Sequence, residues 1–179
     1  MSARYDYDVV VLGGGSGGLA AAFRAAKHGA RVAIMEPGEL GGTCVNLGCV
    51  PKKAMWLAAD LASKIELAGA LGFDVVRPTL TWQELVTHRQ GYIGNIHASY
   101  RRRLDDDGVV LIPQRGVLQD RHTLMGADGV PVTAEHIVIA TGAHPLRPHV
   151  EGAEHGHVSD DFFNLCHAPD HVAIVGGGY

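Results

Sequence analysis

The fold is decided by the stretch Tyr7-Asp8-Val9-Val10-Val11-Leu12-Gly13-Gly14-Gly15-Ser16-Gly17-Gly18, in which a short apolar run leads directly into a glycine-rich loop. The apolar run is rich in β-branched residues, which predicts a buried parallel strand. Good helix formers follow from Leu19 to His28, and Gly29 suits the C-cap. A further apolar run, Arg31 to Met35, predicts a second strand. This order of strand, glycine loop, helix and strand is typical of an α/β fold with a parallel sheet.

The glycine loop also carries a dinucleotide-binding fingerprint. In the pattern G-x-G-x-x-G, Gly13 permits the tight turn, Gly15 lets the backbone approach a pyrophosphate, and Gly18 allows the helix to pack closely on the strand. Glu36 stands 18 positions after the last of these glycines. Its carboxylate can accept hydrogen bonds from a ribose and should repel a 2′-phosphate, so the loop is predicted to bind FAD or NAD rather than NADP. The alternative is a glycine-rich turn with an incidental acid.

Two cysteines lie just downstream of the fingerprint. Cys44 and Cys49 are separated by four residues, and from Val50 onwards the sequence is helical, with Pro51 acceptable in the first turn. The apolar positions of that helix are spaced by three or four: Ala54, Leu57, Ala58, Leu61, Ile65 and Ala68. Cys49 is therefore expected near a helix N-terminus, where unpaired N–H groups favour a thiolate. The alternatives are an inert thiol pair or half of a zinc site, but no second close cysteine pair or convincing His-x-x-x-His follows.

Composition bounds the possible functions. The 179 residues are 46% hydrophobic and 19% charged, which suits one globular domain with a real core. The net charge of -4 and pI near 6.2 give no electrostatic case for nucleic acid or an anionic membrane. We expect a cytoplasmic protein, because no run reaches the roughly 18 to 20 apolar residues of a membrane span and the N-terminus lacks a signal-peptide pattern.

Beyond the cysteines, the chain predicts a long helix followed by short strands. The helix runs from Trp82 to about Leu104, and its stripe comprises Leu85, Arg89, Tyr92 or Ile93, Ile96, Tyr100 and Leu104, with core packing expected for Tyr92. Short β-type runs at about 109–133, divided by turn residues, predict a small antiparallel meander, and Ile137 to Ala140 predicts a further strand.

The C-terminal part predicts a loop and then a second nucleotide-binding start. Residues 143–157 are rich in proline, glycine and histidine, and the histidines 144, 149, 155 and 157 are irregularly spaced, which favours solvent-exposed side chains over a metal site. Cys166 is expected to be a small buried residue or an idle thiol. Val172 to Val175 predicts a buried strand that leads into Gly176-Gly177-Gly178-Tyr179, a second fingerprint that stops before its third glycine.

A resemblance to a known family comes from the run Gly41-Gly42-Thr43-Cys44-Val45-Asn46-Leu47-Gly48-Cys49-Val50-Pro51-Lys52-Lys53 behind the first glycine loop. It closely resembles the flavin-dependent pyridine nucleotide-disulfide oxidoreductases. Within that family, Val50-Pro51-Lys52-Lys53 and Met55-Trp56 are most similar to the glutathione reductases, whereas dihydrolipoamide dehydrogenases and mercuric reductases usually carry serine between the proline and the lysine. The resemblance spans essentially the whole chain.

The resemblance implies a relay in which NADPH reduces FAD, the flavin reduces a Cys44–Cys49 disulfide, and the dithiol reduces glutathione disulfide. Cys44 would attack the substrate and Cys49 would face the flavin as the charge-transfer thiolate. Lys52 would lie near the reactive nitrogen of the flavin. The remaining positions that match FAD contacts, together with the fingerprint glycines, are Ser16, Gly17, Glu36, Thr43, Cys44, Thr141 and Gly142. Ser16 and Tyr100 match substrate positions, whereas Phe23 stands where some glutathione reductases have a substrate-binding arginine.

The resemblance also implies a domain organisation. The expected fold class is a Rossmann-type FAD-binding domain over 1–150, with a parallel sheet, a long helical segment and the meander. A linker over 151–170 and the start of an NAD(P)H-binding domain over 171–179 follow. We expect the chain to be an N-terminal portion of a homodimeric reductase and inactive alone. Trypanothione reductase, dihydrolipoamide dehydrogenase and a non-catalytic flavin-binding module are the alternatives.

Overall fold

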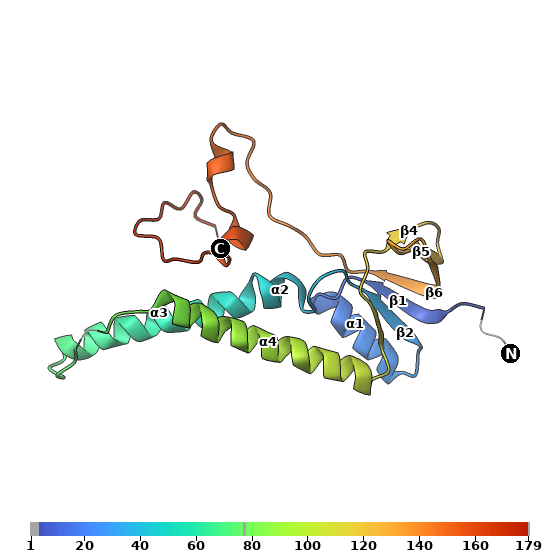
Figure 1. The fold of residues 1–179 in the computed structure, drawn as a ribbon, viewed down its shortest axis with the longest axis horizontal. Coiled ribbons are helices and arrows are strands. Elements are labelled where there is room, and N and C mark those ends of the chain that lie inside the picture. Colours follow the sequence, from blue (N-terminus) through green and yellow to red (C-terminus); the bar gives the residue numbers. More distant parts are fainter. Residues whose placement is uncertain (1–3, 77, 179) are drawn as a thin grey trace.

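A six-stranded sheet forms the body of the molecule in the computed structural model, which describes residues 4–76 and 78–178 (Figure 1). Its strand order is β3-β2-β1-β6-β5-β4. The parallel strands are β1 (Tyr7–Leu12), β2 (Val32–Met35), β3 (Val110–Ile112) and the second half of β6 (Pro131–Ile139). The antiparallel end is made by β4 (Val117–Leu118), β5 (Thr123–Met125) and the first half of β6. The predicted α/β class is confirmed.

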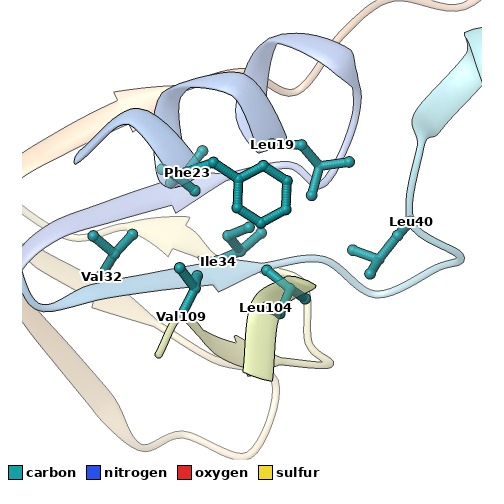
Figure 2. Packing of buried hydrophobic residues seen from close by; sticks show 9 residues of the cluster. Leu19, Phe23, Val32, Ile34, Leu40, Leu104 and Val109 are labelled. Atoms are coloured by element: carbon teal, nitrogen blue, oxygen red, sulfur yellow. The ribbon is translucent and has the colours of Figure 1, made fainter. Parts of the chain in front are cut away.

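Two apolar clusters cover the two faces of the sheet, because successive side chains of a strand point to opposite faces. On one face, helix α1 (Ser16–Lys27) contributes Leu19 and Phe23, which pack against Ile34 of β2 (Figure 2). On the other face, Val10 and other buried residues of β1, β2 and β6 pack with Leu124 of the antiparallel end. The glycine loop therefore lies at the end of a strand that is held from both sides.

Two long helices extend away from the sheet (Figure 1). They are α3 (Cys49–Ala70) and α4 (Trp82–Asp106), which pack on each other and confirm both predicted helices. At about 1.5 Å per residue, the 25 residues of α4 extend over about 37 Å. Leu104, near the end of α4, returns to the core beside Phe23. Large apolar side chains of α3, such as Leu57 and Leu61, are more than half exposed.

One strand prediction needs correction. The segment at 109–112 was expected to open the meander, but β3 instead pairs in parallel with β2 at the edge of the main sheet. A parallel partner lies far away in sequence, so local turn residues could not reveal this pairing. The strand predicted at 137–140 is formed as the second half of β6, whose first half pairs antiparallel with β5.

The C-terminal part is mostly irregular. It contains a 3₁₀ turn, η1 (Ala153–His155), and the short helix α5 (Ser159–Phe162). The strand predicted at Val172–Val175 is not formed: these residues are coil, and Val175 is 98% exposed. No strand of the described chain pairs with them, and an extended segment without a ladder partner is not a sheet strand. Tyr179, the last residue of the predicted second fingerprint, lies outside the described residues.

The C-terminal segment is attached to α4 by two hydrogen bonds. Trp82 Nε1 donates to the carbonyl of Leu165 over 3.2 Å, and Arg89 Nη2 donates to the carbonyl of Phe163 over 2.9 Å. Cys166, next in the chain, is an exposed free thiol, so the buried alternative for this residue is wrong. Among the helices described, none is both long and apolar enough to cross a bilayer.

Candidate functional site

The glycine loop is a tight backbone turn that only glycine fits. Gly13 has φ +104°, and a Cβ added there would lie 2.3 Å from the carbonyl oxygen of Ala140. A Cβ on Gly18 would lie 1.8 Å from the carbonyl oxygen of Gly13 and would also meet the Val11 side chain. The turn predicted at Gly13 and the close packing of helix on strand predicted at Gly18 are therefore both present.

The loop opens into a cleft of about 490 Å³. The N-terminus of α1, beginning at Ser16, forms part of its wall, so the positive end of that helix faces the cleft. A Cβ on Gly17 would meet nothing within 4 Å, which leaves the backbone there open to a ligand. The lining comprises Gly13, Gly15, Ser16, Gly17, Glu36, Gly42, Thr43, Cys44, Ala140, Thr141, Gly142 and Ala143.

The cleft brings together nearly all the residues predicted to contact a cofactor. Thr141 and Gly142 follow β6, whereas Thr43 lies 98 residues before Thr141, and all three line the same space. Two predicted contacts do not line it. Gly18 lies beneath the loop against Gly13, and Lys52 is exposed on the first turn of α3.

Glu36 is held rigidly at the edge of the cleft. Its Oε2 accepts the backbone N–H of Gly14 over 2.7 Å, and its Oε1 accepts the backbone N–H of Gly38 over 2.8 Å. Each carboxylate oxygen has further lone pairs, so both remain able to accept a ribose hydroxyl. The sequence predicted the ribose contact but not these two backbone bonds.

The two cysteines lie on separate helices that meet. Cys44 belongs to α2 (Gly42–Asn46), a short helix that the sequence did not predict, and Cys49 is the first residue of α3, as predicted. Both are free thiols, with Cys49 exposed and Cys44 half-buried. They are close enough for their side chains to hydrogen bond.

The pKa of the Cys44 thiol is raised above its ordinary value. The hydrogen bond to Cys49 is the largest cause, followed by burial and by the charge of Cys49. A hydrogen bond from Ser16 opposes this shift because it stabilises the Cys44 thiolate. Cys44 therefore keeps its proton more readily beside Cys49, and two thiolates side by side would repel each other.

The predicted substrate residues have different surroundings. Ser16 contacts Cys44 and lines the cleft. Tyr100 is half-buried against the cluster that contains Phe23, and its predicted role is not tested by this packing. Phe23 is 6% exposed, with the Arg103 guanidinium 4.0 Å from its ring centroid, so it serves the core. Tyr92 is 60% exposed, so core packing was the wrong expectation for it.

The structure adds one cluster that the sequence did not suggest. Asn46, the last residue of α2, contacts His97 of α4, and His97 lies 3.5 Å from the Glu39 carboxylate. Only a weak signal in the sequence could have pointed to His97: it lies four positions after Ile93 and seven before Leu104, on the buried side of α4.

The histidines of the C-terminal loop are exposed. His155 and His157 lie near single carboxylates, those of Glu154 and Asp161. Over residues 4–76 and 78–178, no three histidine, cysteine or acidic side chains gather as a metal site would need.

Comparison with known proteins agrees with this architecture. Residues 7–179 match the sequence profile described as "Pyridine nucleotide-disulphide oxidoreductase". The glutathione reductase of Schizosaccharomyces pombe is 46% identical over 97% of the chain, and that of Yarrowia lipolytica is 44% identical over 97%. A protein of Emiliania huxleyi named thioredoxin reductase SEP1 is 40% identical over 99%. The chain spans only 39%, 40% and 39% of the lengths of these three relatives.

Proposed function

Because the chain belongs to the pyridine nucleotide-disulphide oxidoreductase family, we propose that its cysteine pair reduces glutathione disulfide with electrons that pass from NADPH through FAD. The observation that carries the proposal is the contact between the thiols of Cys44 and Cys49 at the wall of the cleft beside the glycine loop. The names of the two glutathione reductases described above support glutathione disulfide as the substrate.

The residues of the cleft fit FAD. The helix N-terminus at Ser16 offers backbone N–H groups to a pyrophosphate, and the open backbone at Gly17 allows its approach. Glu36 offers two fixed carboxylate oxygens to ribose hydroxyls. When bound, FAD would supply the two-electron chemistry that reduces the disulfide. The cation of Lys52 is proposed to favour the reduced ring.

The dithiol chemistry follows from the thiol geometry. Cys44 gives up its proton and attacks one sulfur of glutathione disulfide, which forms a mixed disulfide and releases one glutathione thiolate, and this thiolate takes up the proton that Cys44 lost. The Cys49 thiolate then attacks the Cys44 sulfur, releases the second glutathione and leaves a Cys44–Cys49 disulfide. Two electrons from NADPH restore the dithiol. Ser16 stabilises the Cys44 thiolate through its hydrogen bond and so assists the first attack.

The competing substrates separate the glutathione proposal from its alternatives. Turnover of the full-length protein should be fastest with glutathione disulfide when it is compared with trypanothione disulfide, lipoamide and oxidised thioredoxin, each with NADPH. The thioredoxin arm is needed because one relative carries that name. A clear preference for lipoamide or thioredoxin would overturn the substrate assignment.

The 179 residues alone are proposed not to turn over. The second glycine run is exposed coil in this structure, so the described residues do not build a second nucleotide site. NADPH oxidation on addition of glutathione disulfide to the purified 179-residue chain would contradict this, and its absorbance spectrum would show whether it retains flavin. A homodimer for the full-length protein and a cytoplasmic location stay predictions.

A further inference from the structure

The position of Cys44 depends on contacts that hold α2. This helix has five residues, far below the roughly 12 to 15 at which a helix becomes stable by itself. Its N-cap, Gly41, supplies no side-chain cap, although the backbone N–H of Gly41 bonds to the carbonyl of Gly14 over 2.8 Å. The side of α2 that faces α4 must therefore supply part of the restraint.

Asn46 is the side chain on that side, and its amide is already oriented. Its Nδ2 donates to the carbonyl of Gly42 over 3.0 Å and also lies within reach of the carbonyls of Glu39 and Leu40. Because the amide nitrogen is used in this way, Oδ1 is the atom that faces His97. Oδ1 lies 2.7 Å from His97 Nε2, and since Oδ1 can only accept, Nε2 must carry the proton.

The other nitrogen of His97 faces an acid. Nδ1 lies 3.5 Å from Oε2 of Glu39, and the same oxygen lies 2.5 Å from Nη2 of Arg101, one turn further along α4. The His97 side chain is 13% exposed, whereas Glu39 and Arg101 are more than half exposed. A neutral ring with its proton on Nε2 would direct a lone pair of Nδ1 at the carboxylate. The imidazolium form donates on both sides and satisfies both neighbours.

We propose that His97 is a positioning residue for the redox pair: its ring joins Asn46 to Glu39 and thereby holds the helix that carries Cys44. The inference rests on the proposed function, because holding Cys44 matters to turnover only if Cys44 attacks the substrate. His97 itself touches neither thiol in the described structure and acts through Asn46.

The test measures how readily Cys44 is alkylated, which does not require turnover. The full-length protein is reduced with dithiothreitol, desalted and treated with iodoacetamide, and peptide fragmentation locates the label on Cys44 or Cys49. His97→Ala should raise the Cys44 rate about fivefold, as expected for loss of one part-buried hydrogen bond. His97→Gln should restore the wild-type rate at pH 6, because its amide nitrogen can replace Nε2. His88→Ala, an exposed histidine of the same helix, is the matched control and should change nothing.

A double variant guards against a general loss of folding. Asn46→Ala should raise the Cys44 rate at least as much as His97→Ala, because it also removes the bonds of Nδ2, and adding His97→Ala to it should change nothing further, because the bond to His97 is already lost. Additive effects, or a His97→Gln rate equal to that of His97→Ala at pH 6, would overturn the role of His97. If these rates behave as expected but glutathione disulfide is not reduced, the proposed function fails while the positioning role stands.

Discussion

Two glycine-rich runs of this chain are similar in sequence and different in structure: Val9-Val10-Val11-Leu12-Gly13-Gly14-Gly15 and Val172-Ala173-Ile174-Val175-Gly176-Gly177-Gly178. The first forms β1 and the wall of a cleft, whereas the second is exposed coil. Val11 has no exposed surface, and Ile174, at the matching position, is 85% exposed.

The difference comes from neighbours rather than from the runs themselves. Gly13 and Gly176 share a left-handed backbone, with φ +104° and +114°. However, β1 pairs with β2 on one side and β6 on the other, and α1 covers one of its faces. The second run pairs with no strand of the described chain. An apolar run followed by glycines is therefore competent to form a nucleotide-binding strand, but pairing and burial decide whether it does.

The largest effect we expect concerns the cysteine pair, which follows the first glycine-rich run in the chain. Cys44→Ser should abolish glutathione disulfide reduction but keep the thiolate–flavin absorption band, because Cys49 remains. Cys49→Ser should abolish both. Cys166→Ser, a thiol near the second run, should leave turnover unchanged. The measurements are NADPH oxidation and the long-wavelength absorbance of the reduced full-length protein. If Cys44→Ser alone lost the band, the two roles would have to be exchanged.

The next effect concerns the backbone of the two loops in the 179-residue chain. Gly18→Ala should lower the free energy of unfolding by roughly 3 kcal/mol or more, because its Cβ cannot avoid the Gly13 carbonyl 1.8 Å away. Gly178→Ala should change it by less than about 0.5 kcal/mol, since a Cβ there meets nothing within 4 Å. Urea unfolding compares the two. Equal losses would mean that both loops are packed.

A smaller difference is expected between matching apolar side chains. Val11→Ala removes two methyl groups from a closed core and should cost about 2 kcal/mol of unfolding free energy. Ile174→Ala removes a larger group from an exposed position and should cost less than about 0.5 kcal/mol. The urea midpoints of the two variants test this. A large loss for Ile174→Ala would show that the second run is buried in solution.

The smallest effect we expect concerns Asp6, the acidic residue that precedes the first glycine-rich run. The pKa of Asp6 is lowered, chiefly by the side-chain hydrogen bond from Thr133, whose hydroxyl lies 2.7 Å from Oδ2. A lowered pKa in the folded state adds stability above the unfolded value of about 3.9, and that stability is lost as the pH falls through the folded pKa.

Asp6→Asn should therefore cost about 0.5 kcal/mol at pH 7, since the site is exposed, and the difference should shrink below about pH 4. Asp170→Asn, before the second run, is the control and should have no effect at either pH. Thermal unfolding at the two pH values measures both variants. A cost of Asp6→Asn that grew at low pH would reverse the sign of this assignment.

Much of the first half of the chain could be predicted because its signals are local. Helix formers between Ser16 and Gly29 and the three-to-four spacing after Val50 depend on neighbours within a turn or two. The five-residue helix that carries Cys44 was missed, because it is too short for any periodicity. The exposure of Tyr92 was also missed, since the stripe on α4 shows which side is apolar but not where a partner helix ends.

In the candidate site too, some features could be predicted from the sequence and others could not. The fingerprint glycines, Glu36 and the spacing of the cysteines can be read from short runs, because a tight turn or a helix N-terminus needs particular residue types at fixed separations. The convergence of Thr43 with Thr141, and of Asn46 with His97, depends on how distant segments pack. Nothing within either segment specifies its partner.

By itself, the sequence determined that a strand, a glycine turn and a helix precede a close cysteine pair, since these features follow from short-range sterics and hydrogen bonding. Only the tertiary structure decided which of the two glycine runs becomes a buried strand, which thiol is raised in pKa by the other, and which histidine supports the helix that carries Cys44. Those outcomes depend on contacts between residues far apart in the chain, whose free energy is gained only when the whole sheet and its helices have assembled.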